Sequence, residues 1–374
     1  MIWLIIVIPV CYAVALGLLY YGHQRVSLFS SESLLEKHYF SVVVPFRNEA
    51  KNLPELLKSL QQLNYPTTHF ELLLINDASS DNSEAIVHNI LKGSAINYKI
   101  LQNTPNQSSP KKTAITLAIH AAQFSWIVTT DADCTVPKNW LHTLNIFIQK
   151  TEAICVAMPV DYHTQPSFLH TYQQLDNWSL QAVTIGSFGL ENPLLSNGAN
   201  FAYTKDAFHE VNGFKDNLHI ASGDDMFLLE KFKLKFPKKI AYLKSEGAIV
   251  STLPVNSWRQ LSSQRVRWAS KTSQQKSIAT KALGLLVFLN CIFILISPIV
   301  MIYSTAAFVA CLTGLLIKLL ADFLFMRCSS TFFGKKINYY IFFISTFIYA
   351  VLTIYVVFSS LFSSYTWKQR SYRM

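Results

Sequence analysis

Acidic side chains occur in short groups that could bind a cation or move a proton. Asp131 and Asp133 flank one alanine directly after the apolar run 126–129. In an extended or turn segment, residues i and i+2 can both reach one ion, and carboxylates are hard oxygen ligands that suit Mg²⁺ or Mn²⁺. Such a cation would neutralise charge on a departing diphosphate. A solvated turn, or capping of a helix by Asp133, gives the same short pattern.

Asp224 and Asp225 precede the helical run 226–232. One interpretation is structural, because acidic residues at the start of a helix interact favourably with its dipole. The functional interpretation is a general base that takes the proton from an attacking hydroxyl group. Two adjacent acids could divide that work, one taking the proton and the other orienting it.

Asp77 follows a second apolar run, 70–75, and is itself followed by Ser79, Ser80 and Asp81. This pattern is typical of an Asx-turn that ends a strand and caps the next helix. It would equally place a carboxylate to accept from a base N–H or a ribose hydroxyl. Lys111 and Lys112 open a predicted helix, where cations oppose the helix dipole, and this placement hints at a bound anion.

Gln264, Arg267 and Trp268 are spaced i, i+3, i+4 and therefore share one face of a helix. That face would present an amide, a forked cation that binds phosphate bidentately, and an indole that stacks on a sugar or excludes water. A helix at the membrane interface, anchored by Trp and Arg ahead of a span, has the same composition. Both interpretations stay open from this segment alone.

The elements that must position these residues alternate between strand and helix signals. Alternation of this kind predicts an α/β fold with a mostly parallel sheet and helices on both faces. Ligands of such sheets bind at the carboxyl ends of the strands. The segments 47–49, 76–78 and 131–133 fall at these ends. The predicted strands are 39–45, 70–75, 98–101 and 126–129, and the predicted helices are 48–63, 83–91 and 112–124.

The composition indicates a membrane protein. Apolar residues make up 51% of the 374 residues and charged residues 14%, whereas a soluble domain carries about 25% charged residues. The ranges 1–22, 282–317 and 337–366 contain no charged side chain. A spanning helix needs about 20 apolar residues, so these ranges predict about four transmembrane helices. A cleaved signal peptide is the alternative for 1–22, but no basic region precedes its apolar run.

The net charge of +10 has two explanations. Lys and Arg gather beside spans on the cytoplasmic face, and basic surfaces attract anionic lipid and phosphate-bearing substrates. Basic residues follow the first span and precede the second, so we expect the region between them to be cytoplasmic. The six cysteines form no Cys-x-x-Cys pair, which suits a reducing compartment. No recognisable nucleic-acid-binding module accompanies the basic residues, so we expect no nucleic acid partner.

Two features of the C-terminal region need separate treatment. Lys318 and Asp322 lie four residues apart near the end of the third predicted span and could form a helical ion pair. The tail residues Lys368, Arg370 and Arg373 indicate a cytoplasmic tail, whereas a single span over 337–362 would put the tail outside. The sequence leaves the side of the tail undecided.

Taken in order, these motifs resemble the family-two glycosyltransferases with a GT-A fold, over about residues 38–270. They look closest to the membrane-integrated Gln-x-x-Arg-Trp branch, which includes cellulose, chitin and hyaluronan synthases and ceramide glucosyltransferases. The sequence departs from the family pattern at two places: Pro110 stands where the family often has Gly before its loop lysine, and Asp224 stands where it often has Glu, which is a conservative change. The motifs are residues 44–49, 76–81, 111–112, 131–133, 223–225 and 264–268.

The resemblance implies a role for each matching residue. On the donor side, Asp77 would bind the base, with Pro45 and Glu49 lining the same pocket, and Asp131 would face the ribose or phosphate. Asp133, with Asp131, would hold a divalent metal ion (Mg²⁺ or Mn²⁺), and Lys112 would lie near the nucleotide. Gln264, Arg267 and Trp268 would lie beside the donor diphosphate and the acceptor end. Asp225, with Asp224, matches the catalytic base, and Asn197, Gly198 and Asn200 match an acceptor-side loop.

The predicted organisation is an N-terminal transmembrane helix (1–22), a cytoplasmic GT-A domain (38–255), an interfacial segment (256–280) and a C-terminal transmembrane region (281–366). The predicted function is inverting transfer of a sugar from a nucleotide-diphosphosugar, with UDP favoured by resemblance, to a hydroxyl of a lipid or membrane-bound glycan acceptor. The expected location is a bacterial-type inner membrane. A processive polysaccharide synthase and a non-catalytic membrane scaffold on a transferase fold are the alternatives.

Overall fold

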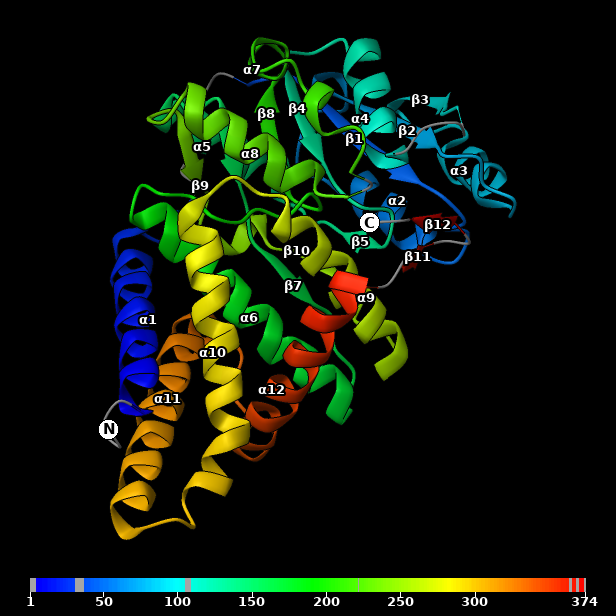
Figure 1. Ribbon diagram of the computed structural model, residues 1–374. Coiled ribbons are helices and arrows are strands. Elements are labelled where there is room, and N and C mark those ends of the chain that lie inside the picture. The colour runs from blue at the N-terminus through cyan, green and yellow to red at the C-terminus, as the bar shows by residue number, and fades with distance from the viewer. Residues whose placement is uncertain are drawn as a thin grey trace. The chain divides into compact units, whose positions relative to one another are not determined.

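The computed structural model describes residues 5–30, 37–104, 109–220, 222–362, 365–367 and 370–372 (Figure 1). The chain divides into two compact units. The sheet unit consists of Val26–His163 and Glu191–Leu253, and the helical unit consists of Met1–Arg25, Thr164–Leu190 and Pro254–Met374. Each unit is therefore built from segments that are far apart in the sequence.

A seven-stranded sheet forms the centre of the sheet unit, in the order β3-β2-β1-β4-β8-β6-β9. β1 pairs in parallel with β2 and β4, and β2 with β3, whereas β8 runs antiparallel to both of its neighbours. The predicted mostly parallel α/β sheet is confirmed. The strands are β1 (Phe40–Phe46), β2 (Phe70–Asn76), β3 (Asn97–Gln102), β4 (Trp126–Thr129), β6 (Cys155–Ala157), β8 (Phe201–Thr204) and β9 (Ile240–Tyr242).

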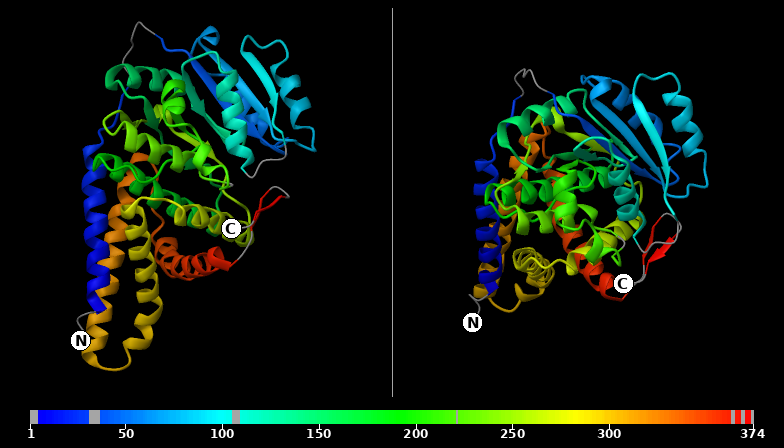
Figure 2. Two further views of the ribbon diagram at one scale, coloured as in Figure 1. Left: turned by 45° about the horizontal axis from the view of Figure 1, so that its top comes forward. Right: turned by 90° about the horizontal axis from the view of Figure 1, so that it is seen from above.

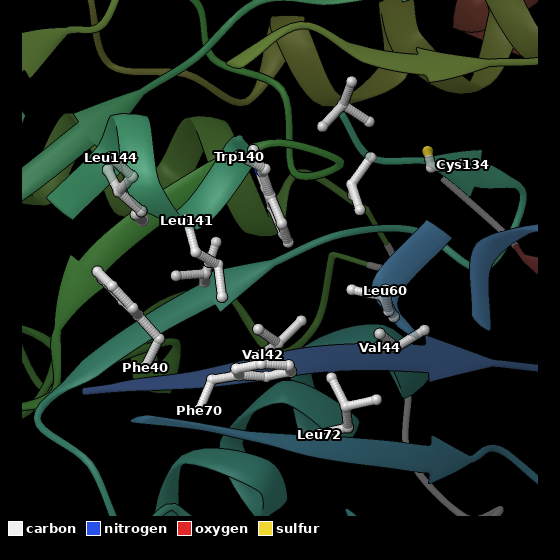
Figure 3. Packing of buried hydrophobic residues seen from close by; sticks show 14 of the residues in the cluster. Phe40, Val42, Val44, Leu60, Phe70, Leu72, Cys134, Trp140, Leu141 and Leu144 are labelled. Atoms are coloured by element: carbon white, nitrogen blue, oxygen red, sulfur yellow. The ribbon is translucent and has the colours of Figure 1, made fainter. Parts of the chain in front are cut away.

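Helices cover both faces of this sheet. Alternate residues of a strand point to opposite faces, and Phe40, Val42 and Val44 of β1 pack into a buried cluster with α2, α3 and α5 (Figure 3). α4 contacts β1 and β2 without joining that cluster, so it covers the other face. The helices of the unit are α2 (Leu53–Gln61), α3 (Ser83–Leu91), α4 (Pro110–Ala121), α5 (Trp140–Thr151), α7 (Lys205–Glu210) and α8 (Asp224–Lys235), with short 3₁₀ turns at Thr67–His69, Lys215–Asn217 and Glu246–Ala248.

A second, three-stranded sheet fixes the chain that follows β4. Its strands are β5 (Cys134–Thr135), β10 (Val250–Thr252) and β7 (Val160–Tyr162), in that order. β10 pairs antiparallel with β5 and parallel with β7. The segment between β4 and β5, which carries Asp131 and Asp133, is therefore held at both ends by strands.

Among the residues that the structure describes, the helical unit contains four helices that are long and apolar enough to cross a membrane, as the sequence predicts (Figure 2). These are α1 (Val7–Arg25), α10 (Ile278–Val300), α11 (Thr305–Phe332) and α12 (Tyr339–Phe362). The unit also holds α6 (Phe168–Gly189), α9 (Trp258–Ser273) and a hairpin of β11 (Tyr365–Trp367) and β12 (Arg370–Tyr372). α6 belongs to this unit although it lies inside the range 38–255 predicted for the soluble domain.

Glycines let α1 and α6 approach to backbone contact. A Cβ atom on Gly186 would lie 2.3 Å from the carbonyl oxygen of Leu19, and one on Gly189 would lie 1.8 Å from that of Gly22. Both distances are far below van der Waals contact, so only glycine fits at these places. Small residues at a helix crossing are a common way to pack helices closely in membranes.

The predicted ion pair on α11 is present. Lys318 Nζ lies 2.5 Å from Asp322 Oδ2, and both side chains are buried. The hydroxyl of Tyr12, on α1, donates to Asp322 Oδ1 at 2.7 Å. Because intramembrane charge is costly unless it is paired, this arrangement satisfies Asp322 from two helices at once.

Candidate active site

The loops after β1 and β2 are joined by side-chain hydrogen bonds. Arg47 Nη1 donates to the carbonyl oxygens of Asp77 and Ala78, at 2.6 and 2.7 Å. The backbone N–H of Ser80 donates to Asn48 Oδ1 at 2.8 Å, and that of Asn48 donates to Ser79 Oγ at 3.1 Å. Asn48 and Ala78 both adopt positive φ, 52° each, which turns the chain sharply at the strand ends. The two predicted motifs therefore form one structure.

Asp77 is buried at this junction, with 5% of its surface exposed. Its backbone N–H donates to Phe46 O at 2.9 Å, and Asn103 Nδ2 donates to its Oδ1 at 2.9 Å. The other acceptor of the Asn103 amide is Pro110 O, at the start of α4, so Asp77 is linked to the helix that carries the lysines. Pro45 pairs in register with Ile75 of β2, so it too lies at these strand ends. Glu49 follows, its Oε2 accepting from Asn52 Nδ2 at 2.7 Å.

Asp131 and Asp133 lie on one side of the segment between β4 and β5. Both are partly exposed, whereas Ala132 and Cys134 between and after them are buried. The backbone N–H of Cys134 donates to Asp131 O at 3.1 Å and closes the turn. Burial raises the pKa of the Cys134 thiol, and the negative charges of Asp133 and Asp131 raise it further. Both residues are thus partly accessible to solvent, and their shared binding of one ion stays a prediction.

Lys111 connects this segment to the second acidic group. Its Nζ lies 2.7 Å from Asp131 Oδ1 and 3.3 Å from Asp224 Oδ2. Burial by itself would lower the pKa of Lys111, but the attraction of Asp131 and Asp224, with Asp225 contributing, outweighs it and raises the pKa above its ordinary value. Lys111 is therefore a fixed positive charge that brings acids from β4 and α8 to one place.

Asp224 and Asp225 form the first turn of α8, after Gly223, whose φ is 83°. Asp225 Oδ2 accepts from the backbone N–H of Gly198 at 3.0 Å, and its Oδ1 accepts from that of Met226 at 2.8 Å. A Cβ atom on Gly198 would lie 2.8 Å from Asp224 Oδ2 and 3.3 Å from Lys111 Nζ. A side chain at 198 would therefore displace the carboxylate of Asp224 or the ammonium group of Lys111.

The loop that contains Gly198 is anchored by its neighbours. Asn200 is fully buried, and its Nδ2 donates to Pro159 O at 2.7 Å and Ala248 O at 2.8 Å. Its Oδ1 accepts from Trp140 Nε1 at 2.9 Å, so the amide holds the loop in place with bonds inside the protein. Asn197 Oδ1 accepts from the backbone N–H of Ala199 at 3.0 Å. Of the predicted acceptor-side residues, Gly198 is the one in contact with the acidic group.

The two lysines of α4 have different surroundings. Lys112 is fully buried, and its Nζ donates to Asn217 O at 2.7 Å and Ile220 O at 2.9 Å. Its Nζ also lies 4.8 Å from the ring centroid of Phe227. Both lysines were predicted to lie near a bound anion, and Lys112 near the nucleotide, but it is Lys111 that faces the acids. Consecutive residues of a helix point about 100° apart, so only one of the pair could do so.

Gln264, Arg267 and Trp268 all lie on α9, in the helical unit. Their neighbour Arg265, which the sequence analysis left without a role, contacts two of them. Its Nη1 donates to Gln264 Oε1 at 3.0 Å, and its guanidinium carbon lies 4.2 Å from the ring centroid of Trp268. Arg265 also forms an ion pair with Asp176 of α6. The motif is thus connected to α6 through Arg265, which occupies one of its variable positions.

Asp131 and Asp133 fit a divalent cation that is shared with a diphosphate. Among the residues the structure describes, no group of three or more His, Cys, Asp and Glu side chains could hold a metal ion alone. Mg²⁺ is usually bound by one or two carboxylates together with substrate phosphates. Two partly exposed carboxylates on one side of a turn are a donor set of that kind.

Comparisons with known proteins concern the family and the fold of the chain. Residues 41–211 match the family described as "Glycosyl transferase family 2". The fold resembles that of the mannosyltransferase PcManGT from Pyrobaculum calidifontis, solved with GDP-Man and Mn²⁺, with a TM-score of 0.60 over 97% of this chain and 99% of that chain. At 15% sequence identity this likeness concerns the fold alone. The fold is thus GT-A-like, and residues 41–211 are similar to family-two glycosyltransferases.

Two curated relatives match parts of the chain. The poly(ribitol-phosphate) β-N-acetylglucosaminyltransferase TarS of Staphylococcus aureus is 32% identical over 30% of this chain and 19% of its own length. The undecaprenyl-phosphate 4-deoxy-4-formamido-L-arabinose transferase of Shewanella sediminis is 30% identical over 36% of this chain and 40% of its own length. The chain therefore spans less than half the length of either relative.

Proposed function

We propose that this protein is an inverting glycosyltransferase that moves a sugar from a nucleotide-diphosphosugar to a hydroxyl group of a lipid acceptor in the membrane. One observation carries the proposal. Lys111 joins Asp131 to Asp224, and Asp225 is held one residue further along against Gly198. A cation site and a candidate base are thereby brought together within a fold of the glycosyltransferase class.

The donor nucleotide binds, in this proposal, at the carboxyl ends of β1 and β2. Asp77 recognises the base, with Pro45 and Glu49 beside it, and Asp131 faces the ribose or phosphate. The relation to PcManGT, which was solved with GDP-Man and Mn²⁺, supports a nucleotide-sugar donor and a divalent cation. We favour a uridine nucleotide because the motifs resemble those of enzymes that use it.

Asp133 and Asp131 hold the divalent cation, which supplies positive charge to the departing diphosphate. Lys111 adds a second, permanent positive charge next to Asp131. Gln264 and Arg267 of α9 bind the diphosphate oxygens, since a guanidinium group pairs bidentately with phosphate. Trp268 shields the reacting groups from water.

Asp225 acts as the general base. The acceptor hydroxyl oxygen forms a bond to the anomeric carbon, the bond from that carbon to the diphosphate oxygen breaks, and the hydroxyl proton passes to the carboxylate of Asp225. Attack from the side opposite the diphosphate inverts the configuration of the sugar. The two backbone N–H groups that donate to Asp225 hold its carboxylate in a fixed orientation.

A lipid acceptor is supported by two observations. The helical unit offers four helices able to cross a membrane, and one relative is named for transfer to undecaprenyl phosphate. The acceptor hydroxyl could belong to a lipid or to a glycan carried by a lipid. Lipid extracts incubated with a panel of nucleotide-sugars, and analysed by mass, would identify both substrates.

Replacement of Asp225 by Asn tests the base assignment. We expect transfer to fall by about 10²–10⁴-fold while the folded protein still binds donor, with some loss of thermal stability because the amide nitrogen would face one of the two backbone N–H groups that donate to Asp225. Asp206→Asn, at an exposed position of α7, is the matched control and should leave transfer unchanged. Asp133→Ala should abolish the dependence of transfer on added Mg²⁺ or Mn²⁺. Undiminished transfer by a folded Asp225→Asn protein would refute the assignment.

Two alternatives give different products. A processive polysaccharide synthase would yield long chains, whereas single transfer adds one sugar mass to the acceptor, so product length in a purified system separates them. A non-catalytic scaffold would neither transfer nor hydrolyse any sugar of a broad donor panel. The acidic residues present at every motif position favour an enzyme.

A further inference from the structure

The guanidinium group of Arg265 contacts three other side chains in the helical unit. It forms an ion pair with Asp176 of α6, donates a 3.0 Å hydrogen bond to Gln264 Oε1, and lies 4.2 Å from the centre of the Trp268 ring. Its side chain is 11% exposed and that of Asp176 8% exposed. A charged residue of an amphipathic helix is thus turned inward, towards a carboxylate on another helix.

We propose that Arg265 is a positioning residue that sets the orientations of Gln264 and Trp268, and that Asp176 is the anchor that fixes Arg265. This inference rests on the proposed function, in which Gln264 and Trp268 act beside the donor diphosphate. It adds two residues to the transfer machinery. Neither of them needs to touch a substrate.

The contact with Arg265 decides which way the Gln264 amide faces. A glutamine amide has one acceptor oxygen and one nitrogen with two donor hydrogens. Because the guanidinium group donates to Oε1, the nitrogen must point away from Arg265. The amide then presents donors only, which suits diphosphate oxygens that can only accept. Without Arg265 the amide could rotate and present its oxygen to the anion, which would repel it.

The contact with Trp268 fixes the indole in the same way. The guanidinium carbon lies over the ring face at 4.2 Å, a distance at which cation and ring attract each other. Arg265 and Trp268 are three residues apart on α9, so this stacking selects one side-chain conformation of the indole. A lysine at 265 would keep the positive charge. It lacks the planar guanidinium group, which can contact the carboxylate of Asp176, the amide of Gln264 and the ring of Trp268 at the same time.

The ion pair itself is a poor way to hold α6 and α9 together. Burying two charges costs several kcal/mol, and apolar residues of similar volume often stabilise a protein equally well. The two helices already contact each other through aromatic rings. The ring centroids of Tyr172 and Phe168 of α6 lie 5.3 and 6.3 Å from that of Trp258 of α9. The pair is therefore better explained by what it positions than by the stability it adds.

An apolar replacement of the whole pair separates positioning from stability. In the double variant Asp176→Leu with Arg265→Met we expect a melting temperature equal to that of the wild type, because no unpaired charge remains. We expect kcat for sugar transfer to fall by about 100-fold, as for other small misplacements of reacting groups, and KM for the donor to rise, because a rotated Gln264 amide would repel the donor diphosphate. Arg265→Lys should show the same loss of kcat.

The control is Arg259→Met, at an exposed position of the same helix, which should leave kcat and stability unchanged. A folded double variant that transfers sugar at the wild-type rate would overturn the positioning role and leave the proposed function standing. A full-length wild-type protein that transfers no sugar from any donor of a broad panel would overturn the proposed function and this inference with it. The variants are assayed in the full-length protein in detergent or lipid bilayers.

Discussion

Lys111 and Lys112 show how one residue of offset separates a site residue from a structural one. Lys111 lies between the carboxylates of Asp131 and Asp224, whereas Lys112 donates to two backbone carbonyls and is fully buried. Both side chains carry the same charge, so composition does not distinguish them. The direction in which each leaves α4 decides its role.

We expect Lys111→Met and Lys112→Met to differ in their effect on transfer. Lys111→Met removes the positive charge between Asp131 and Asp224, so transfer should fall far more than it does in Lys112→Met. Lys112→Met leaves Asn217 O and Ile220 O without their donor, which should lower the free energy of unfolding by about 1–3 kcal/mol. Denaturant unfolding and transfer assays on the two variants check this. Equal losses of transfer in the two folded variants would contradict it.

The other candidate residues were predictable to different degrees. Asp77, Asp131 and Asp225 each follow a strand or begin a helix, so residue type and place along the chain were enough to bring them to one edge of the sheet. The direction of a side chain within a helix was not predictable at that precision, so the sequence did not distinguish Lys111 from Lys112 and did not place Arg265 in the site. Asn200 was predicted for its position in a loop, but its three internal hydrogen bonds depend on partners far away in the sequence.

At the scale of elements, the strands with long apolar runs were predicted to within one residue at either end. β1, β2, β3 and β4 carry the alternating or continuous apolar patterns that sequence analysis detects. β5, β6, β7, β9 and β10 contain two or three residues each, too few to show a period, and their pairing comes from tertiary contacts. α6 lies within the range predicted for the soluble domain. Its contact with α1 through glycine residues could not be predicted from the sequence of α6 alone.

The crossing of α1 and α6 gives a prediction about glycine. Gly186→Ala would put a methyl group 2.3 Å from Leu19 O, so the helices must separate. We expect a loss of about 1–3 kcal/mol, typical of overpacked contacts. Gly17→Ala, on α1 with nothing within 4 Å of its Cβ position, is the matched control and should leave stability unchanged or raise it by about 0.5–1 kcal/mol. Thermal unfolding in detergent compares the two. A Gly186→Ala protein as stable as Gly17→Ala would show that the helices do not cross at this point.

The contact between α1 and α11 gives a second prediction at this scale. Tyr12→Phe removes one hydrogen bond to Asp322, and interhelical hydrogen bonds in membranes contribute about 0.6 kcal/mol on average. Asp322→Leu leaves the buried ammonium group of Lys318 without its partner, and breaking a buried ion pair costs about 3–5 kcal/mol. Asp322→Leu should therefore be much the less stable variant when both are unfolded in the same detergent. The reverse order would mean that Lys318 reaches water in the folded protein.

For the whole molecule, the side of the membrane that holds the C-terminal tail depends on α12. This helix is long and apolar enough to cross, which by itself would place the tail opposite the loop between α11 and α12. In the helical unit, however, the backbone of β11 lies close to that of α9. α9 carries Arg259, Arg265 and Arg267, and such basic segments stay on the cytoplasmic side. The length of α12 therefore predicts a tail outside the cytoplasm, whereas the contact between β11 and α9 predicts a cytoplasmic tail. The basic residues of the tail favour the cytoplasmic side.

We accordingly expect the tail to be cytoplasmic, with α12 returning to the side from which it starts. A green fluorescent protein fused after Met374 should fluoresce in bacterial cells, and an alkaline phosphatase fused there should be inactive, because the first folds only in the cytoplasm and the second only outside it. The same two reporters placed in the turn between α10 and α11, after Tyr303, should give the opposite pair of results. An active phosphatase after Met374 would show that α12 crosses the membrane, and the packing of β11 on α9 would then be wrong.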